Sequence, residues 1–82
     1  MAYDMTVHAA EEMTADDLDI IDVEEAVLNG QVVRKEVDDP RGTRYVIEGV
    51  AADGETQVGI VGRFQGNERY LIITVYEVSK EQ

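Results

Sequence analysis

The feature that most constrains this chain is a change of hydrophobic spacing at Gly30. Before Gly30, apolar residues recur three or four positions apart, which is the spacing of one face of an α-helix. After it, apolar residues alternate with polar ones or form short runs, which is typical of extended strands. Helical spacing followed by extended spacing predicts helices that pack on a sheet, which is an α+β fold.

A first helix is predicted to begin after Thr6, which is a suitable N-cap residue. Its apolar positions at helical spacing are Val7, Ala10 and Met13. Glu11 and Glu12 are expected to face solvent. The acid-rich segment 14–17 interrupts the pattern and is expected to end the helix.

A second helix is predicted from Asp19, a good N-cap residue, to Asn29 and Gly30. Its apolar stripe consists of Ile20, Val23 and Val27. Asn29 and Gly30 are the residue types that adopt a left-handed conformation most readily, so a left-handed helix end is expected there.

Four extended segments follow the helices. They are Gln31–Val37, Arg44–Val50, Gln57–Phe64 and Tyr70–Val78. The predicted turns between them are Asp38–Gly42, Ala52–Glu55 and Gln65–Glu68, and the second has the strongest signal because Asp-Gly accepts positive φ. These short connections predict a four-stranded antiparallel β-meander packed against two N-terminal helices, in the order α-α-β-β-β-β. The predicted core residues are Val23, Val27, Val58, Ile60, Ile72 and Val75.

The composition indicates a small intracellular protein. Its 82 residues suit a single domain over residues 1–82. No apolar run approaches the roughly 18–20 residues that span a bilayer, and no export signal is visible at the N-terminus. The absence of cysteine removes disulfides and thiolate metal sites, so a cytoplasmic location without cofactor or metal is expected.

The charge is unevenly distributed along the chain. The net charge is −11, and residues 1–30 contain nine acidic residues and no lysine or arginine. Such a segment repels the phosphates of nucleic acid and attracts basic proteins, so weak RNA binding at most and a basic protein partner are expected. The alternative is that these acids only keep the protein soluble.

Two segments, Thr6–Met13 and Leu18–Gly30, resemble bacterial domain-of-unknown-function family 4258. The family commonly shows a Ser/Thr-x-His-Ala opening, a methionine five residues after the histidine, and a helix of the type Asp-Val-x-x-Ala-Leu-x-x-Gly. Its Arg-Tyr strand is matched here by Arg44 and Tyr45, and its terminal strand by Leu71–Tyr76.

The resemblance implies a relation to small RNase toxins of the RelE and MqsR kind, in which helices pack on a curved antiparallel sheet. Such toxins cut RNA without metal, and members of the family are often encoded beside a zinc-binding antitoxin. The chain departs from the family pattern at Glu12 and Asp16, where the family often carries arginine. These two charge reversals weaken the inference of RNA binding for that helical edge.

The candidate catalytic residues are one histidine and a set of strand-borne arginines and tyrosines. His8 is the only histidine and the best single candidate for proton transfer near neutral pH. The strand candidates are Arg44, Tyr45, Arg63, Arg69 and Tyr70. Arginine matches the geometry of phosphate, and tyrosine donates a proton or stacks on a base. Each of these residues also has a structural interpretation, as a capping histidine or as ordinary residues of a half-exposed sheet.

Two functions follow from these observations. The first is a protein-binding module of toxin-like ancestry with an acidic helical interaction face, whose partner is a basic or zinc-finger antitoxin-like protein. The second is a metal-independent endoribonuclease toxin that acts on mRNA in a toxin–antitoxin pair.

Overall fold

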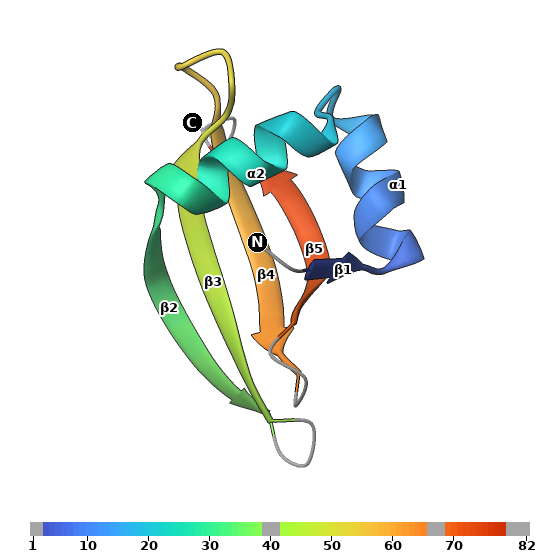
Figure 1. The fold of residues 1–82 in the computed structure, drawn as a ribbon, viewed down its shortest axis with the longest axis vertical. Helices are drawn as coiled ribbons and strands as arrows, with labels where there is room; N and C mark the ends of the chain where they lie inside the picture. The colour runs from blue at the N-terminus through green and yellow to red at the C-terminus, as the bar shows by residue number, and fades with distance from the viewer. Residues whose placement is uncertain (1–2, 39–41, 66–68, 79–82) are drawn as a thin grey trace.

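The computed structural model describes residues 3–38, 42–65 and 69–78 (Figure 1). Within these residues it contains two helices and a five-stranded mixed sheet, which confirms the predicted α+β class. The elements are β1 (Tyr3–Met5), α1 (Val7–Ala15), α2 (Ile20–Asn29), β2 (Gln31–Asp38), β3 (Gly42–Val50), β4 (Gln57–Phe64) and β5 (Tyr70–Glu77).

The sheet has the strand order β1-β5-β4-β3-β2. Strands β2 to β5 form the predicted antiparallel meander. The prediction of only four antiparallel strands is wrong, because β1 adds a fifth strand that runs parallel to β5, from Tyr3 opposite Tyr70 to Met5 opposite Ile72. Three residues are too few to show an alternating pattern, so this strand left no periodic signal in the sequence.

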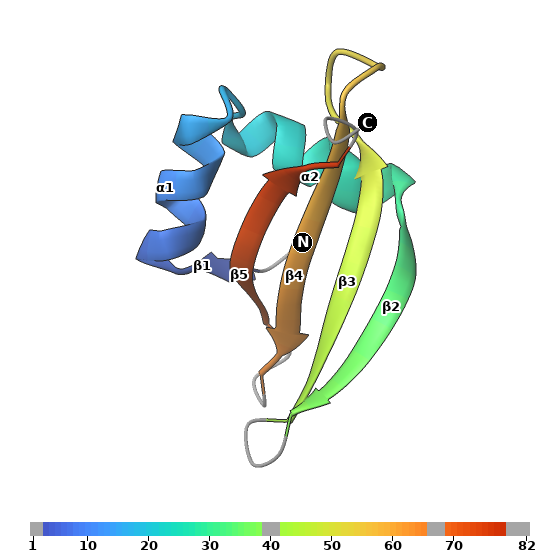
Figure 2. The ribbon, with the colours of Figure 1, turned by 180° about the vertical axis from the view of Figure 1, so that it is seen from behind.

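Both helices lie on the same side of the sheet, and none of the described helices or strands covers the opposite face (Figure 2). Helix α2 packs on β3 and β4, whereas α1 lies beside β5. Helix α2 approaches the sheet closely at Gly49, where an added Cβ would collide with the carbonyl oxygen of Ala26. Glycine at this position therefore allows the helix to lie directly on the sheet.

Helix α1 begins as predicted but turns a different face inward. The hydroxyl of Thr6 accepts a hydrogen bond from the backbone N–H of Ala9 at 3.0 Å, which confirms the N-cap. Ala9 is fully buried and Met13 packs against the core, whereas Val7 is 75% exposed. The predicted stripe is thus wrong at Val7, because the helix lies at the sheet edge and buries only a narrow face.

Two acidic side chains of this helical edge point toward the sheet. The carboxylate of Glu12 accepts a hydrogen bond from the backbone N–H of Val75 at 3.2 Å. Asp16 accepts one from the backbone N–H of Glu77 at 3.3 Å. The expectation that Glu12 faces only solvent is therefore wrong, since a strand edge offers N–H donors to an adjacent carboxylate.

Helix α2 has the predicted N-terminus and an unexpected C-terminus. Asp19 and Asp22 form a reciprocal capping box, in which each carboxylate accepts a backbone N–H of the other residue. Gly30 has φ −88° and an extended conformation, so the predicted left-handed end is wrong. The glycine instead permits close packing, because an added Cβ would collide with the carbonyl oxygens of Ala26 and Glu48.

The core lies between the helices and the sheet. The predicted residues Val23, Val58, Ile60, Ile72 and Val75 are buried, and Val27 is partly buried against them. The described part of the chain has no helix long and apolar enough to cross a membrane.

The predicted hairpin turn between β3 and β4 is confirmed. Gly54 has φ +77°, which few other residues adopt, and the carboxylate of Asp53 accepts hydrogen bonds from Glu55 and Thr56. The other two predicted turns include residues 39–41 and 66–68, which lie outside the described residues.

Candidate functional site

The sheet face opposite the helices gathers most of the strand-borne charges. Because Gly49 and Ile60 face the helices, their neighbours along each strand face the other way. We call this surface the open face (Figure 2). Its side chains come from Arg34, Glu36, Arg44, Val46, Glu48, Val61, Arg63, Thr74 and Tyr76.

Glu36 of the edge strand β2 links two arginines on the open face. One oxygen of its carboxylate lies 2.9 Å from Nε of Arg34, and the other lies 3.2 Å from a terminal nitrogen of Arg44. Nε of Arg44 is buried and has no hydrogen-bond partner among the described residues. An anion would therefore have to compete with Glu36 for these guanidinium groups.

Tyr76 lies next to this charged cluster. Its ring occupies the space over Gly59, where an added Cβ would collide with the ring. Burial raises the pKa of the Tyr76 phenol above its usual value of 10.0; Glu48 and Glu36 raise it further, and Arg34 opposes them. The phenol is thus protonated near neutral pH and can donate a hydrogen bond.

The structure groups four of the six predicted catalytic residues into two pairs, which lie on opposite faces of the sheet. Arg44 and Arg63 lie on the open face, whereas Tyr45 and Tyr70 lie on the helix-facing side. The Tyr70 hydroxyl donates to the carbonyl of Tyr45 at 3.3 Å, and burial raises the pKa of Tyr70 to about 12. Tyr45 and Tyr70 both pack against Phe64 in an aromatic cluster. The two tyrosines therefore have a packing role in this conformation.

Arg69 holds β1 against the rest of the chain. Its guanidinium donates to both carboxylate oxygens of Asp4 at 2.9 Å and to the carbonyl of Tyr3 at 2.8 Å. These hydrogen bonds hold the pKa of Asp4 below its usual value of 3.8. Arg69 thus joins the N-terminal strand to the region before β5.

His8 lies on α1, whereas the open-face arginines lie on the strands. Its side chain is 67% exposed, and Nε2 lies 3.1 Å from a carboxylate oxygen of Glu12 one turn later. The histidine and the open-face arginines therefore do not form one cluster.

Sequence reasoning missed four side chains of the open face, namely Arg34, Glu36, Glu48 and Tyr76. The signal that would have found them is the pairing of β2 with β3, which sets Glu36 opposite Arg44. This pairing includes an irregularity between Val32 and Arg34, which shifts the alternation within β2. Alternation counted from the sequence alone would therefore assign part of the strand to the wrong face.

A metal site is not built by the described residues, since they contain no group of three or more histidine, cysteine, aspartate or glutamate side chains that could hold an ion. The open face offers guanidinium donors, a protonated phenol and two carboxylates. This set can bind an anion or a polar surface by hydrogen bonds.

The fold and this site define a small α+β domain with a polar, uncovered sheet face. The chain belongs to the family described as Domain of unknown function (DUF4258), whose family model matches residues 5–77. No curated protein and no solved structure matches the chain.

The positions that carried the resemblance have structural roles in this chain. Thr6 caps α1, and Ala9 and Ala26 are fully buried. Asp22 completes the capping box and also accepts a hydrogen bond from the backbone N–H of Ala52 at 3.1 Å. The motif residues therefore account for how the helices are attached and do not by themselves indicate an activity.

Proposed function

We propose that the chain is a protein-binding module of toxin-like ancestry whose acidic helical half attracts a basic partner. The observation that carries the proposal is charge: residues 1–30 hold nine acidic side chains and no lysine or arginine. A surface of one sign steers oppositely charged proteins toward it and raises the association rate at low salt. A basic protein, including one of the antitoxin kind, is the expected partner.

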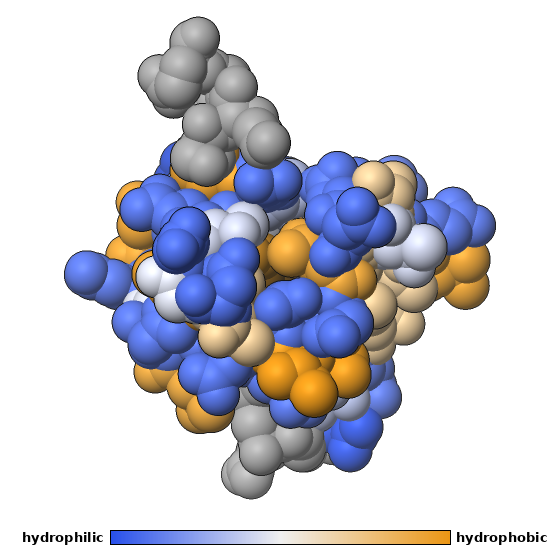
Figure 3. All heavy atoms as spheres, turned by 90° about the horizontal axis from the view of Figure 1, so that it is seen from above, coloured by the Kyte–Doolittle hydropathy of each residue, from blue (hydrophilic) through white to orange (hydrophobic). Residues whose placement is uncertain are grey.

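The nine acids divide into two groups. Six accept hydrogen bonds from the chain itself, namely Asp4, Glu12, Asp16, Asp19, Asp22 and Glu24. The other three, Glu11, Asp17 and Glu25, are exposed, and their side chains have no hydrogen bond or ion pair within the described residues. Figure 3, which looks down on the end where α2 lies, shows a mainly hydrophilic surface with separate apolar patches. Asp16 and Asp19 are also exposed, but they already accept backbone hydrogen bonds, so Glu11, Asp17 and Glu25 are the acids most available to a partner.

The placement of the catalytic candidates supports binding over catalysis. Acid–base catalysis needs its proton donors and acceptors within hydrogen-bond reach of the reacting atoms. His8 lies on α1, Tyr70 is buried, and Arg69 is bound to Asp4. These candidates do not converge on one point.

Proximity labelling in the native host cell tests this proposal. The intact chain is compared with a variant that carries Glu11→Gln, Asp17→Asn and Glu25→Gln, and with a Glu55→Gln control that removes a carboxylate outside the helical half. We expect proteins of net positive charge among those labelled by the intact chain, and several-fold less labelling of them by the triple variant. Equal labelling by the triple variant and the control would contradict the role of the acidic half.

A metal-independent endoribonuclease is the second candidate function, and one observation favours it. The open face carries three arginines, and the buried Nε of Arg44 has no acceptor among the described residues. Buried donors of this kind are costly unless an acceptor is bound. A phosphate oxygen would satisfy this donor, and the Tyr76 phenol lies on the same face.

Titration and cleavage of a single-stranded RNA in the presence of chelator test the second candidate. We expect Glu36→Gln to strengthen RNA binding because it releases two guanidinium groups, and Arg44→Ala to weaken it. Glu55→Gln removes the same single charge elsewhere and is the matched control. Expression toxicity that disappears with Arg44→Ala or His8→Ala would favour the toxin, whereas unchanged RNA in every reaction would exclude it.

A further inference from the structure

Strand β2 leaves one edge of the sheet without a partner among the described strands. It lies at the end of their order, and β3 is its only described neighbour. Among the described residues, no backbone group of residues 31–37 is bonded to anything but β3. An edge of this length offers N–H and C=O groups to an added strand.

Apolar side chains accompany this edge on the side where the helices lie. Val32 and Val37 point to that side, with Lys35 between them, and the two valines are 56% and 70% exposed. The helices lie over the upper part of the sheet in Figure 1 and leave its lower part bare. Phe64, the last residue of β4, is also largely exposed. An added strand would therefore meet apolar contacts on one of its two faces.

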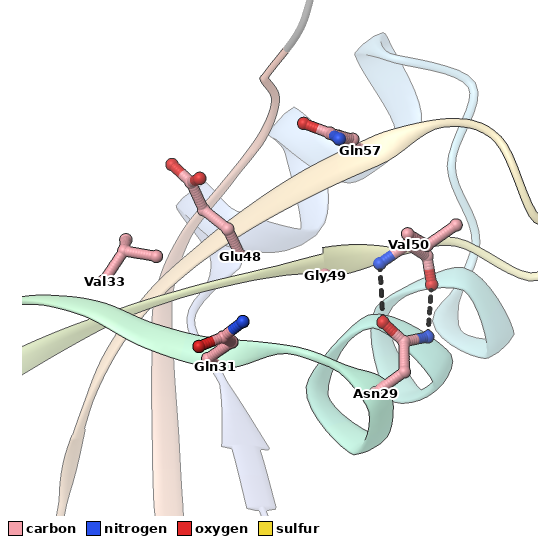
Figure 4. Close-up of a pocket in the computed structure, with 7 residues that line it drawn as sticks. All are labelled: Asn29, Gln31, Val33, Glu48, Gly49, Val50 and Gln57. Carbon is pink, nitrogen blue, oxygen red and sulfur yellow. Dashed lines mark hydrogen bonds between the residues drawn. The ribbon is translucent and has the colours of Figure 1, made fainter.

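A pocket adjoins the same edge on the other side of the sheet. It has a volume of about 260 Å³ and lies on the open face, near the start of β2 (Figure 4). The amides of Gln31 and Gln57 and the carboxylate of Glu48 line it, with Val33 as an apolar wall. The side chain of Glu48 makes no hydrogen bond or ion pair within the described part of the chain. One carboxylate without a partner, beside two side-chain amides and an apolar wall, suits the stem and charged end of a lysine or arginine.

The rim of the pocket is held rigidly. Asn29 pairs with both backbone groups of Val50, since its side chain donates to the carbonyl and accepts from the N–H, each at 2.8 Å (Figure 4). Arg34, the nearest cation along β2, is turned to Glu36 and not to Glu48. The pocket therefore keeps its carboxylate available.

The charge of the whole chain decides between two possible occupants of the edge. A second copy would bring another net charge of −11 close to the first. Like charges at this density oppose association, whereas a basic segment is attracted. A basic extended segment of another protein is therefore favoured over self-pairing.

We infer that β2 pairs with an extended segment of a basic partner, in which apolar residues alternate with lysine or arginine. The apolar residues of the segment contact Val32 and Val37, and one basic side chain enters the pocket to meet Glu48. This inference rests on the proposed function, because the acidic helical half attracts the basic partner and the β2 edge is where a segment of that partner pairs.

The probe is a fluorescent peptide of about nine residues in which lysine alternates with valine. Two further versions are N-methylated, one on its lysines and the other on its valines, so that each lacks the N–H groups of one edge. We expect the unmethylated peptide to bind. One methylated version is expected to bind with an affinity within about twofold of the unmethylated peptide, and the other with an affinity at least tenfold lower. We also expect Glu48→Gln to weaken binding on the order of tenfold, and the matched control Glu55→Gln to change it less than twofold.

The outcomes separate the edge site from the proposed function. Equal binding of both methylated versions, or equal effects of Glu48→Gln and Glu55→Gln, would overturn the edge site and leave attraction of basic partners standing. Failure of the unmethylated peptide to bind at millimolar concentration would also overturn it, while proximity labelling still decides the proposed function. Sedimentation of the free chain is expected to show a monomer, and a dimer would assign the edge to a second copy instead.

Discussion

The two edges of the sheet differ in whether their backbone N–H and C=O groups have partners. At one edge, β1 pairs with the first part of β5, and α1 then supplies hydrogen bonds to the rest of that strand. Thr6 donates to the carbonyls of Ile72 and Ile73, and Glu12 and Asp16 accept from backbone N–H groups further along. At the other edge, β2 has no such cover within the described residues.

This difference teaches that a helix can close a sheet edge with its polar side chains. Uncovered edges promote unwanted association, so their protection is common in soluble proteins. Because one edge of this sheet is protected, the exposure of the other edge indicates a place where another chain can bind. The charged residues Arg34, Lys35 and Glu36 lie at the middle of β2, where they disfavour unselective pairing without blocking a matched partner.

The largest expected effect compares the same substitution at the two sides of the sheet. Val75 in β5 is 1% exposed, whereas Val37 in β2 is largely exposed. We expect Val75→Ala to lower the free energy of unfolding by about 2–3 kcal/mol, because it removes buried methyl groups and leaves a cavity. Val37→Ala is expected to cost less than about 0.5 kcal/mol. Denaturant unfolding measures both values, and similar losses would show that the β2 side is covered after all.

A smaller effect is expected from the residue that joins α1 to the closed edge. Thr6→Ala removes the N-cap of α1 and the hydroxyl donor to the carbonyl of Ile73. We expect a loss of about 1–2 kcal/mol in the free energy of unfolding. Thr14→Ala is the matched control, since its hydroxyl bonds only to the preceding turn of the same helix. Equal losses of unfolding free energy in the two variants would mean that Thr6 does not stabilise the contact between α1 and β5.

The smallest effect concerns the acid sensitivity of the closed edge. Arg69 holds the pKa of Asp4 below its usual 3.8, so the folded chain takes up this proton less readily than the unfolded chain. The interaction therefore contributes to stability above about pH 4 and is lost as the pH falls below that value. We expect the difference in melting temperature between the wild type and Asp4→Asn to shrink as the pH falls from about 6 toward 2. The absence of this trend in a Glu55→Gln control would support the assignment of the effect to the Asp4–Arg69 pair. A melting-temperature difference between wild type and Asp4→Asn that grows in acid would contradict it.

Local features of the fold were predictable from the sequence because they depend on neighbouring residues. The Asp19 cap, the Asp53-Gly54 hairpin and the order of helices and strands all belong to this group. Each is set by side-chain hydrogen bonds or backbone preferences that act within a few residues.

Features that depend on contacts between distant residues were not predictable. Strand β1 is recognised only by its pairing with β5, and the inward turn of Glu12 depends on the same strand edge. The open face required the register of β2 on β3 and its irregularity. Of the candidate site, sequence reasoning named Arg44 and Arg63 but missed Glu36, which neutralises one of them.

Amide hydrogen exchange with and without the lysine–valine peptide tests the contrast between the edges most directly. In the free chain, the amides of Val75 and Glu77 are expected to exchange slowly because Glu12 and Asp16 accept their hydrogens. The outward amides of β2 are expected to exchange fast, and to slow at least tenfold when the peptide binds, while those of β5 stay unchanged. Slow exchange along β2 in the free chain, or fast exchange that persists with the peptide bound, would contradict an open edge that pairs with a partner strand.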